Sequence, residues 1–414
     1  MDQGVAVSKT KKKFPVSLGF GLLIGCLGWL IPYCGLAITL LPAKIGQIDP
    51  THKVTWVATF SAVAMTVAAI SNIIMGALSD RTRSRFGKRT PWIVGCTIAT
   101  MIIFYIMSMI NDIKMLLFLY AIYQIALNGV VASLVAFIPD RVAPDHRGTA
   151  SSFMGLGSTI GNYGAGLIAA HFIIHIQFGI WVFAVFAFVM EAIALWLIKE
   201  PGNRDEPREQ LEKAGDFVKS FAPPIKGTHD FYLALFGRLL LTAGSNMIVG
   251  YQLYIFTDYM SLNSGQTTTN ISLVSSIMLI AGIICGVTAG PLADKVGNYK
   301  YPVAITTMLV GIGAFFPFFM AKPWTMIVYA LIAGIGNGAY NAVDQALTVS
   351  VLPNPDTAAK DLGILNLANT LGQIVGPVIA GVVISSAGYR TMFPVVTGVC
   401  LLGGILILLI HRSK

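Results

Sequence analysis

Amide side chains recur at helical spacing within segments that are otherwise apolar. Gln124 and Asn128 lie four residues apart, and so do Asn337 and Asn341. Residues four apart share one face of a helix, and a polar side chain inside an apolar helix costs free energy unless it faces a cavity or a partner. We therefore expect these amides to line a polar cavity. For any single amide, a hydrogen bond between helices is an equal alternative.

The chemistry of these side chains suits a ligand with many hydroxyl groups. Asn and Gln offer hydrogen-bond donors and acceptors together, and an aromatic ring can stack on the face of a sugar. Two aromatic residues lie four apart in the first apolar segment. The candidate ligand-contacting residues are Trp29, Tyr33, Gln124, Asn128, Asn162, Asn246, Asn337, Asn341, Asn366, Asn369 and Gln373.

A pair of charged residues inside apolar segments could bind and release a proton. Arg238 lies eight residues after a segment start near Asp230, and Asp344 lies seven residues before a segment end near Val351. With both ends at one membrane face, a rise of 1.5 Å per residue puts both charges roughly 10 to 12 Å deep, where they can pair. A carboxylate beside a guanidinium keeps its charge, whereas one separated from it in a dry site takes up a proton. A static ion pair that only joins two helices is the alternative.

The composition indicates that these residues are carried by helices that cross a membrane. Hydrophobic residues make up 55% of the chain and charged residues 11%, with a mean hydropathy of +0.73. At roughly 20 to 25 residues per span, 414 residues leave room for about twelve helices. We predict an all-α membrane protein with spans at 15–42, 54–78, 91–110, 114–138, 149–173, 177–197, 230–258, 270–292, 301–320, 324–350, 361–385 and 390–410.

The same sequence argues against several other classes of protein. The net charge of +9 arises from basic residues in loops between spans, so it does not indicate a nucleic-acid partner. All five cysteines fall inside apolar segments, which argues against a disulfide framework. His171 and His175 lie beside no acid, and no nucleophile motif is present. We expect no enzyme activity, no metal site and no cofactor.

The distribution of basic residues predicts the orientation. With the N-terminus inside, 22 of the 28 Lys and Arg residues fall in cytoplasmic segments and five fall outside. We therefore expect a multi-pass protein of the cell membrane with both termini cytoplasmic. The hydrophilic stretch 199–229 is the predicted linker between domains at 1–198 and 230–414. It is either a flexible tether or contains a short helix on the membrane surface.

An internal repeat supports this division. Gly76, Leu78 and Asp80 recur 214 residues later. Gly148, just before the fifth span, and three glycines within that span recur 215 residues later in the eleventh span. Such a repeat predicts two copies of one six-helix unit. The repeated glycines include Gly157, Gly161, Gly372 and Gly376, which should let helices approach closely.

The polar stretch from Gly76 to Trp92 is the longest motif. It holds five Lys and Arg residues and Asp80 between two apolar segments, with Gly76 and Gly87 for close approach and turning and Pro91 where the next helix can start. The motif resembles the loop between helices 2 and 3 of the major facilitator superfamily. Its detailed form is similar to that of the glycoside, pentoside and hexuronide symporters of the melibiose-permease type and of the sucrose symporters.

The resemblance implies roles for particular residues. It implies two six-helix bundles around a central cavity, toward which the amides point, and a meeting of helices 5 and 11 across the halves. It makes Asp80, Arg81 and Arg85 gating residues that hold the start of helix 11, with Arg141 and Arg147 as a second cluster. Alternatively, all these charges only enforce topology. The segment Val54–Leu78 lacks the acids that bind Na⁺ in melibiose-type carriers. Glu191 in helix 6 is expected to snorkel toward the cytoplasm.

The resulting prediction is a secondary transporter that works by alternating access. We expect it to carry a sugar or glycoside with protons, as a monomer in contact with membrane lipid, with Asp344 and Arg238 as the coupling residues. Proton-coupled efflux of drugs is one alternative. The drug antiporters of the family that this chain resembles carry Gly-x-x-x-Gly-Pro in helix 5, and here Gly372 to Pro377 has that pattern in the second half. A membrane receptor of the same fold that transports nothing is another.

Overall fold

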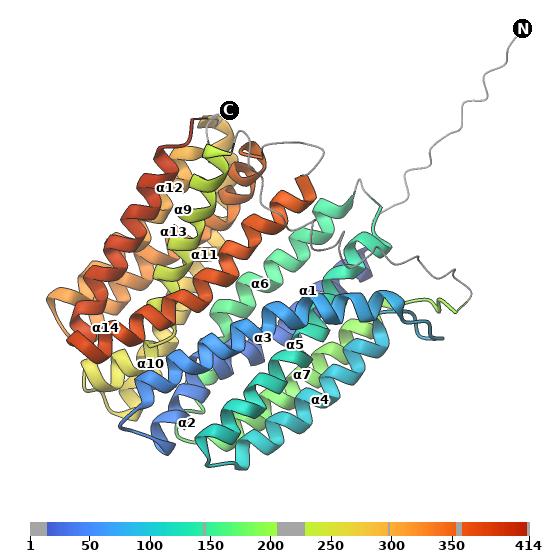
Figure 1. Cartoon of the computed structure of the whole chain (residues 1–414), viewed down its shortest axis with the longest axis horizontal. Helices are drawn as coiled ribbons and strands as arrows, with labels where there is room; N and C mark the ends of the chain where they lie inside the picture. Colours follow the sequence, from blue (N-terminus) through green and yellow to red (C-terminus); the bar gives the residue numbers. More distant parts are fainter. Residues whose placement is uncertain (1–14, 144–145, 205–227, 297–298, 353–357, 412–414) are drawn as a thin grey trace, which may run out of the picture.

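The computed structural model describes residues 15–143, 146–204, 228–296, 299–352 and 358–411, with some side chains in these ranges left out. All the regular elements in this part of the chain are helices, and they form two bundles (Figure 1). The predicted all-α class with two six-helix halves is confirmed. The linker residues 205–227, and with them the question of a surface helix, lie outside the described residues.

The first bundle follows the predicted spans closely. Most helices extend a few residues beyond the apolar run, because the helical backbone continues into the polar loop. The elements of this bundle are α1 (Val16–Gly35), η1 (Leu36–Leu40), α2 (Leu41–Ile48), α3 (Lys53–Arg81), α4 (Thr90–Met109), α5 (Ile113–Arg141), α6 (Arg147–Ala170) and α7 (Ile176–Ile198).

The second bundle repeats this order with one visible break. The predicted seventh span divides at Gly250 and Tyr251, and a π-helical turn follows, as one also follows α1. The elements are α9 (His229–Val249), α10 (Gln252–Tyr254), η3 (Ile255–Tyr259), α11 (Ser264–Val296), α12 (Lys300–Phe319), α13 (Pro323–Ser350) and α14 (Ala358–Leu408).

Twelve membrane segments arise from these elements. Ten helices in the described part of the chain are long and apolar enough to cross a membrane. The last of them runs through α14, where Gly388 has φ +80° and ψ 170°, so that α14 comprises two spans joined at a sharp bend. The remaining span is α6. It is less apolar than the other ten helices because it contains small and polar residues such as Gly157, Ser158 and Asn162.

The repeated glycines serve packing within each bundle as well as between bundles. A Cβ on Gly157 or Gly161 would meet α1, and one on Gly372 or Gly376 would meet α9, so these four let helices of one bundle approach. The expected meeting of helices 5 and 11 across the halves is therefore wrong. Helix 5 (α6) packs across the interface on α11, and helix 11 (the first part of α14) packs on α3. Two other glycines of α6 and α14 do lie at the interface between the bundles. A Cβ on Gly166 of α6 would lie 2.1 Å from Ser275 Oγ, and one on Gly381 of α14 would lie 2.9 Å from Ala58 Cβ.

The two bundles are joined mainly by α3 with α14 and by α6 with α11. We call the end where α3 finishes at Arg81 the basic end, and the end where α2 and α10 lie the closed end. The bundles lie together at the closed end and diverge toward the basic end (Figure 1). The core of each bundle is apolar, and the polar residues of interest lie where the bundles face one another.

Candidate functional site

A central cavity of about 810 Å³ lies between the two bundles. Its lining runs from Pro42 and Ile45 at the closed end to Asn72 and Leu367 toward the basic end. Among the residues that the structure describes, no Asp, Glu, Lys, Arg or His lines it. A cavity of this size, with amide, hydroxyl and aromatic side chains, can hold an uncharged small molecule and fix it by hydrogen bonds.

Most of the predicted ligand-contacting residues lie in this cavity. Asn341 is not among the lining residues; it is exposed, one turn nearer the basic end than Asn337. Asn369 bonds to Arg238, and the side chain of Asn366 lies outside the described residues. The residues that line the cavity are Trp29, Tyr33, Gln124, Asn128 and Asn162 from the first bundle and Asn246, Asn337 and Gln373 from the second.

Sequence reasoning missed several polar lining residues. Asn72 donates from Nδ2 to Asn128 Oδ1 over 3.2 Å, so two helices present one amide pair to the cavity. The only signal for Asn72 was a single amide in an apolar span, without a partner four residues away. The other missed polar residues are Ser61, Tyr120, Ser158, Tyr163, Ser245, Gln252, Ser275, Tyr329 and Thr370.

Five residues of the lining carry buried polar atoms without a hydrogen-bond partner in the described part of the chain. They are Trp29 Nε1, Gln124 Oε1 and Nε2, Ser245 Oγ, Gln252 Nε2 and Tyr329 Oη. Buried polar atoms in folded proteins are nearly always paired. These atoms are available to form hydrogen bonds with a ligand or water in the cavity.

A charged cluster lies beside the cavity in the second bundle. Arg238 Nη2 is 3.0 Å from Asp344 Oδ2, and both side chains are about nine-tenths buried. Asn369 Oδ1 accepts from Arg238 Nε at 3.1 Å and from Thr242 Oγ1 at 3.2 Å. The cluster thus joins α9, α13 and α14. Asn246, two turns along α9 from Arg238, lines the cavity.

Glu191 does not extend toward the cytoplasm, as the sequence analysis expected. It is 2% exposed, and neither carboxyl oxygen has a hydrogen-bond partner among the described residues. The side chain packs against Gly28 of α1, inside the first bundle. Snorkelling fails as an explanation because this residue is on the inner face of α7.

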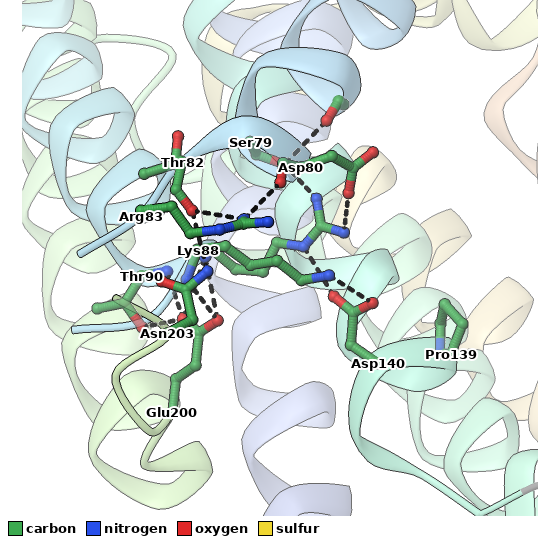
Figure 2. Close-up of polar contacts among 12 residues, drawn as sticks. Ser79, Asp80, Thr82, Arg83, Lys88, Thr90, Pro139, Asp140, Glu200 and Asn203 are labelled. Carbon is green, nitrogen blue, oxygen red and sulfur yellow. Dashed lines mark hydrogen bonds and ion pairs between the residues drawn. The ribbon is translucent and has the colours of Figure 1, made fainter. Parts of the chain in front are cut away.

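A polar network holds the basic end of the first bundle (Figure 2). Its centre is the buried guanidinium of Arg89, which donates to Ser79, to Asp80 and, over 2.9 Å, to Asp140 Oδ2. Lys88 Nζ also reaches Asp140 at 3.0 Å. The network joins α3, α4 and α5. Sequence reasoning gave no role to Arg89, because the motif indicates a turn at Gly87 but not which basic side chain that turn directs inward.

The predicted gating residues have different environments. Asp80 is half exposed and bound to Arg89. Arg81 and Arg85 are exposed. Away from Asp80, Arg141 Nη1 donates to the Lys199 carbonyl at 3.4 Å, and the guanidinium of Arg147 donates to two carbonyls at the end of α5. The arrangement therefore brings Asp80 together with Arg89 and not with the arginines that the motif singled out.

Glu200, just after α7, caps the start of α4. Its carboxylate accepts from the backbone N–H groups of Lys88, Arg89 and Thr90 and from Thr90 Oγ1, at 2.7 to 3.1 Å (Figure 2). A carboxylate at a helix N-terminus pairs with N–H groups that lack helical partners. This cap fixes the beginning of the linker to the loop between α3 and α4.

The closed end carries side-chain contacts between the bundles. Lys53 Nζ lies 2.7 Å from Asp258 Oδ2, which also accepts from Tyr389 Oη at 2.9 Å. The hydroxyl groups of Tyr251 and Tyr254 donate to the carbonyls of Val54 and Pro42 at 2.9 and 2.7 Å. These contacts close one end of the central cavity.

A family model for the Major Facilitator Superfamily matches residues 14–263 and 234–414, which is nearly the whole chain. The chain belongs to this superfamily. It is therefore a multi-pass integral membrane protein of a transporter family. The finer resemblance to sugar symporters stays a prediction.

Similar proteins cover the chain almost from end to end. The multidrug resistance proteins MdtG of Salmonella schwarzengrund and Salmonella newport are 22% identical to it, over 94% of this chain and 95% of theirs. A mutant of the nucleoside transporter NupG has a TM-score of 0.73 at 14% identity, covering 95% of this chain and 100% of that one. A bacterial homologue of the human lysosomal transporter Spinster, inward-facing and unoccupied, has a TM-score of 0.67 at 14% identity, covering 96% of each chain. The structures of these two transporters have the same fold as this chain.

Proposed function

We propose that the protein is a proton-coupled secondary transporter of an uncharged, polyhydroxylated solute of the sugar or glycoside class. The observation that carries this proposal is the set of buried donors and acceptors without partners on Trp29, Gln124, Ser245, Gln252 and Tyr329. Hydroxyl groups both donate and accept, so one such solute can satisfy this mixture, and Trp29 offers a flat face for a sugar ring. A formally charged solute would find no counter-charge on the described lining.

Alternating access supplies the mechanism in this proposal. The loops of the basic end face the cytoplasm of the cell membrane, as the distribution of Lys and Arg predicts, and both termini lie on that side. Because the bundles are joined at the closed end and diverge at the basic end, the structure then corresponds to an inward-facing state. The coupled proton is assigned to the Arg238–Asp344 pair, and the transporter works as a monomer in lipid.

Efflux of an uncharged drug is the second candidate. Apolar and aromatic lining residues, among them Phe60, Met65 and Met278, give part of the cavity an adaptable apolar wall. The relatives named as multidrug resistance proteins favour this candidate. The two candidates differ in which solute competes for the amides and in the direction of coupling.

A transport screen separates them. The purified full chain is reconstituted in liposomes, and labelled monosaccharides, disaccharides, a nucleoside and an uncharged drug are offered with and without an imposed pH gradient. We expect saturable, gradient-driven accumulation of one sugar or glycoside, lost in Gln124→Ala protein and absent from protein-free liposomes. Movement of the drug in exchange for protons, with every sugar excluded, would establish the second candidate instead. If no solute moves, a receptor role replaces both.

A further inference from the structure

Glu191 lies on a second, much smaller cavity inside the first bundle. This cavity has a volume of about 10 Å³, which is close to the space that one water molecule needs. Its lining comes from four helices: Gly28, Trp29 and Pro32 of α1, Thr97 and Thr100 of α4, Tyr123, Leu127 and Val130 of α5, and Ala187 and Glu191 of α7. Trp29 and Leu127 line the central cavity as well. These two side chains are therefore the wall between the carboxyl group and the transport path.

The environment of Glu191 in this state holds a neutral acid. An ionised carboxylate would accept no hydrogen bond from the described residues and would lie in the apolar interior of the bundle, which disfavours the charged form. The titratable groups that face it are Cys26 of α1 and Tyr123 of α5, both uncharged at neutral pH.

Packing alone does not explain an acid at this position. In the first bundle, a Cβ on Gly21 would meet Ile198 and one on Gly28 would meet Glu191. In the second bundle, the glycines at the same spacing, Gly237 and Gly244, would meet Ile407 and Cys400. Cys400 thus fills in the second bundle the place of Glu191. The helix contact works with a small uncharged residue, so the carboxyl group adds something other than packing.

We propose that Glu191 is a proton-binding site of the transport cycle, coupled to the central cavity through Trp29. In the state described here the small cavity has space for about one water molecule and the carboxyl group carries its proton. When Trp29 moves, with a solute in the central cavity or as the bundles rock, water enters the small cavity. The carboxyl O–H bond then breaks, the proton passes to that water, and the carboxylate that remains is hydrated. This inference rests on the proposed alternating-access function but not on the identity of the solute.

The test is infrared spectroscopy of the purified full chain, titrated from about pH 5 to about pH 9. A protonated carboxyl group absorbs separately from a carboxylate, and Glu191→Gln protein identifies the band of this residue by difference. We expect wild-type protein to show this band at low pH and to lose it as the pH rises. Trp29→Ala opens the wall to water and should move the loss of the band to lower pH, by about one unit or more.

Two control variants keep the assignment clear. Asp344→Asn protein should retain the band, because Asp344 belongs to the other bundle. Glu191→Cys copies the second bundle and should elute as a monodisperse protein with a similar thermal midpoint, which shows that loss of the band is not loss of fold. No band attributable to Glu191 at any pH overturns the proposal, and so does a band that neither pH nor Trp29→Ala changes. Since no solute is added, failure of the sugar screen leaves this result standing.

Discussion

At the scale of single residues, the side chain of Gln124 is the most informative part of the cavity lining about ligand binding. The side chain is 1% exposed, yet neither its oxygen nor its nitrogen has a partner among the described residues, while its backbone carbonyl accepts from Asn128 at 2.8 Å. Asn128 is held in turn by Asn72. The amide of Gln124 lies beside the Tyr120 hydroxyl and is otherwise available to a ligand, whereas the amide of Asn128 is already engaged by Asn72.

Gln124→Ala should weaken solute binding by about 1 to 3 kcal/mol, because a hydrogen bond to the ligand is lost and ligand groups stay unpaired. Equilibrium binding of the solute found by the transport screen measures this. The matched control is Asn341→Ala, an amide outside the lining, which should change affinity by less than about twofold. Equal losses in both variants would argue against a specific contact at Gln124.

Asp344→Asn should abolish proton-driven accumulation and leave solute exchange across the membrane intact. The reason is that the Arg238–Asp344 contact of 3.0 Å can be made and broken only by a carboxyl group that changes charge. Accumulation under a pH gradient and exchange without one are compared in the same proteoliposomes. Full accumulation by folded Asp344→Asn protein would remove this residue as a coupling site.

Spacing in the sequence located part of the cavity lining, whereas ligand contact by these residues stays a prediction. Gln124 and Asn128 were found because two amides four apart mark one helix face, and both line the cavity. Asn72 was missed because its partner belongs to another helix. Asn337 and Asn341 have the same spacing but different surroundings, because only one turn separates the cavity wall from exposed helix. The spacing of polar residues predicts which face of a helix they share, but not how far along the helix the cavity extends.

At the scale of elements, the loop between α3 and α4 determines how the basic end is built. Gly87 has φ +89°, and a Cβ there would lie 2.1 Å from Glu200 Cδ. The backbone therefore turns sharply enough to bring Arg89 inward and to place three N–H groups around the Glu200 carboxylate. The sequence motif indicated the turn, whereas the capping acid lies 110 residues away and had no sequence signal.

Gly87→Ala should destabilise the protein by about 1 to 3 kcal/mol, because alanine combines left-handed backbone strain with a clash. Gly95→Ala is the control: this glycine lies within α4, a Cβ there would meet nothing within 4 Å, and alanine favours helix. Thermal unfolding in detergent should show a lower midpoint for the first variant and an unchanged or higher one for the second. Equal midpoints would mean that the loop tolerates a different turn.

Asp80→Asn should slow transport strongly while equilibrium binding of the solute stays nearly unchanged. The carboxyl group of Asp80 is half exposed at the basic end, is not part of the cavity lining, and is bound to Arg89. In the proposed gating role it stabilises closure of this end, so its charge affects the rate of the cycle and not the affinity. Initial uptake rates and binding are measured on one preparation. A parallel loss of both would count against gating.

At the scale of the whole molecule, the two bundles have the same order of apolar segments, but their polar contacts differ. The twelve spans were predictable because long apolar runs and short polar loops are local properties. The bend at Gly388, the break at Gly250 and the divergence of the bundles were not, because they depend on which helices meet. The state of a transporter is a property of the interface and not of the spans.

Breaking the Lys53–Asp258 contact should shift the protein toward the state that is open at the other end. Such a partly exposed ion pair stabilises closure by about 0.5 to 1 kcal/mol, so Lys53→Met should raise the open population about two- to fivefold. A membrane-impermeant thiol reagent, added outside oriented vesicles, reports this through Cys34 in the cavity lining. Cys34→Ser in the same background identifies the labelled site. Unchanged labelling would show that other contacts control closure.

The tyrosines of the closed end impose unequal evolutionary constraints on the two copies of the repeated unit. The hydroxyl groups of Tyr251 and Tyr254 donate to backbone carbonyls at Val54 and Pro42, so the first copy takes part in closure through its main chain. The glycines of α1 and α9 are matched at 216 residues, and Gly35 and Ile38 stand at that distance before the two tyrosines. Mutational drift at the acceptor positions can therefore pass unnoticed, whereas loss of one phenolic oxygen in the second copy cannot. At the tyrosine contacts only the second copy supplies side-chain chemistry, whereas the Lys53–Asp258 pair at the same end requires a side chain from each copy.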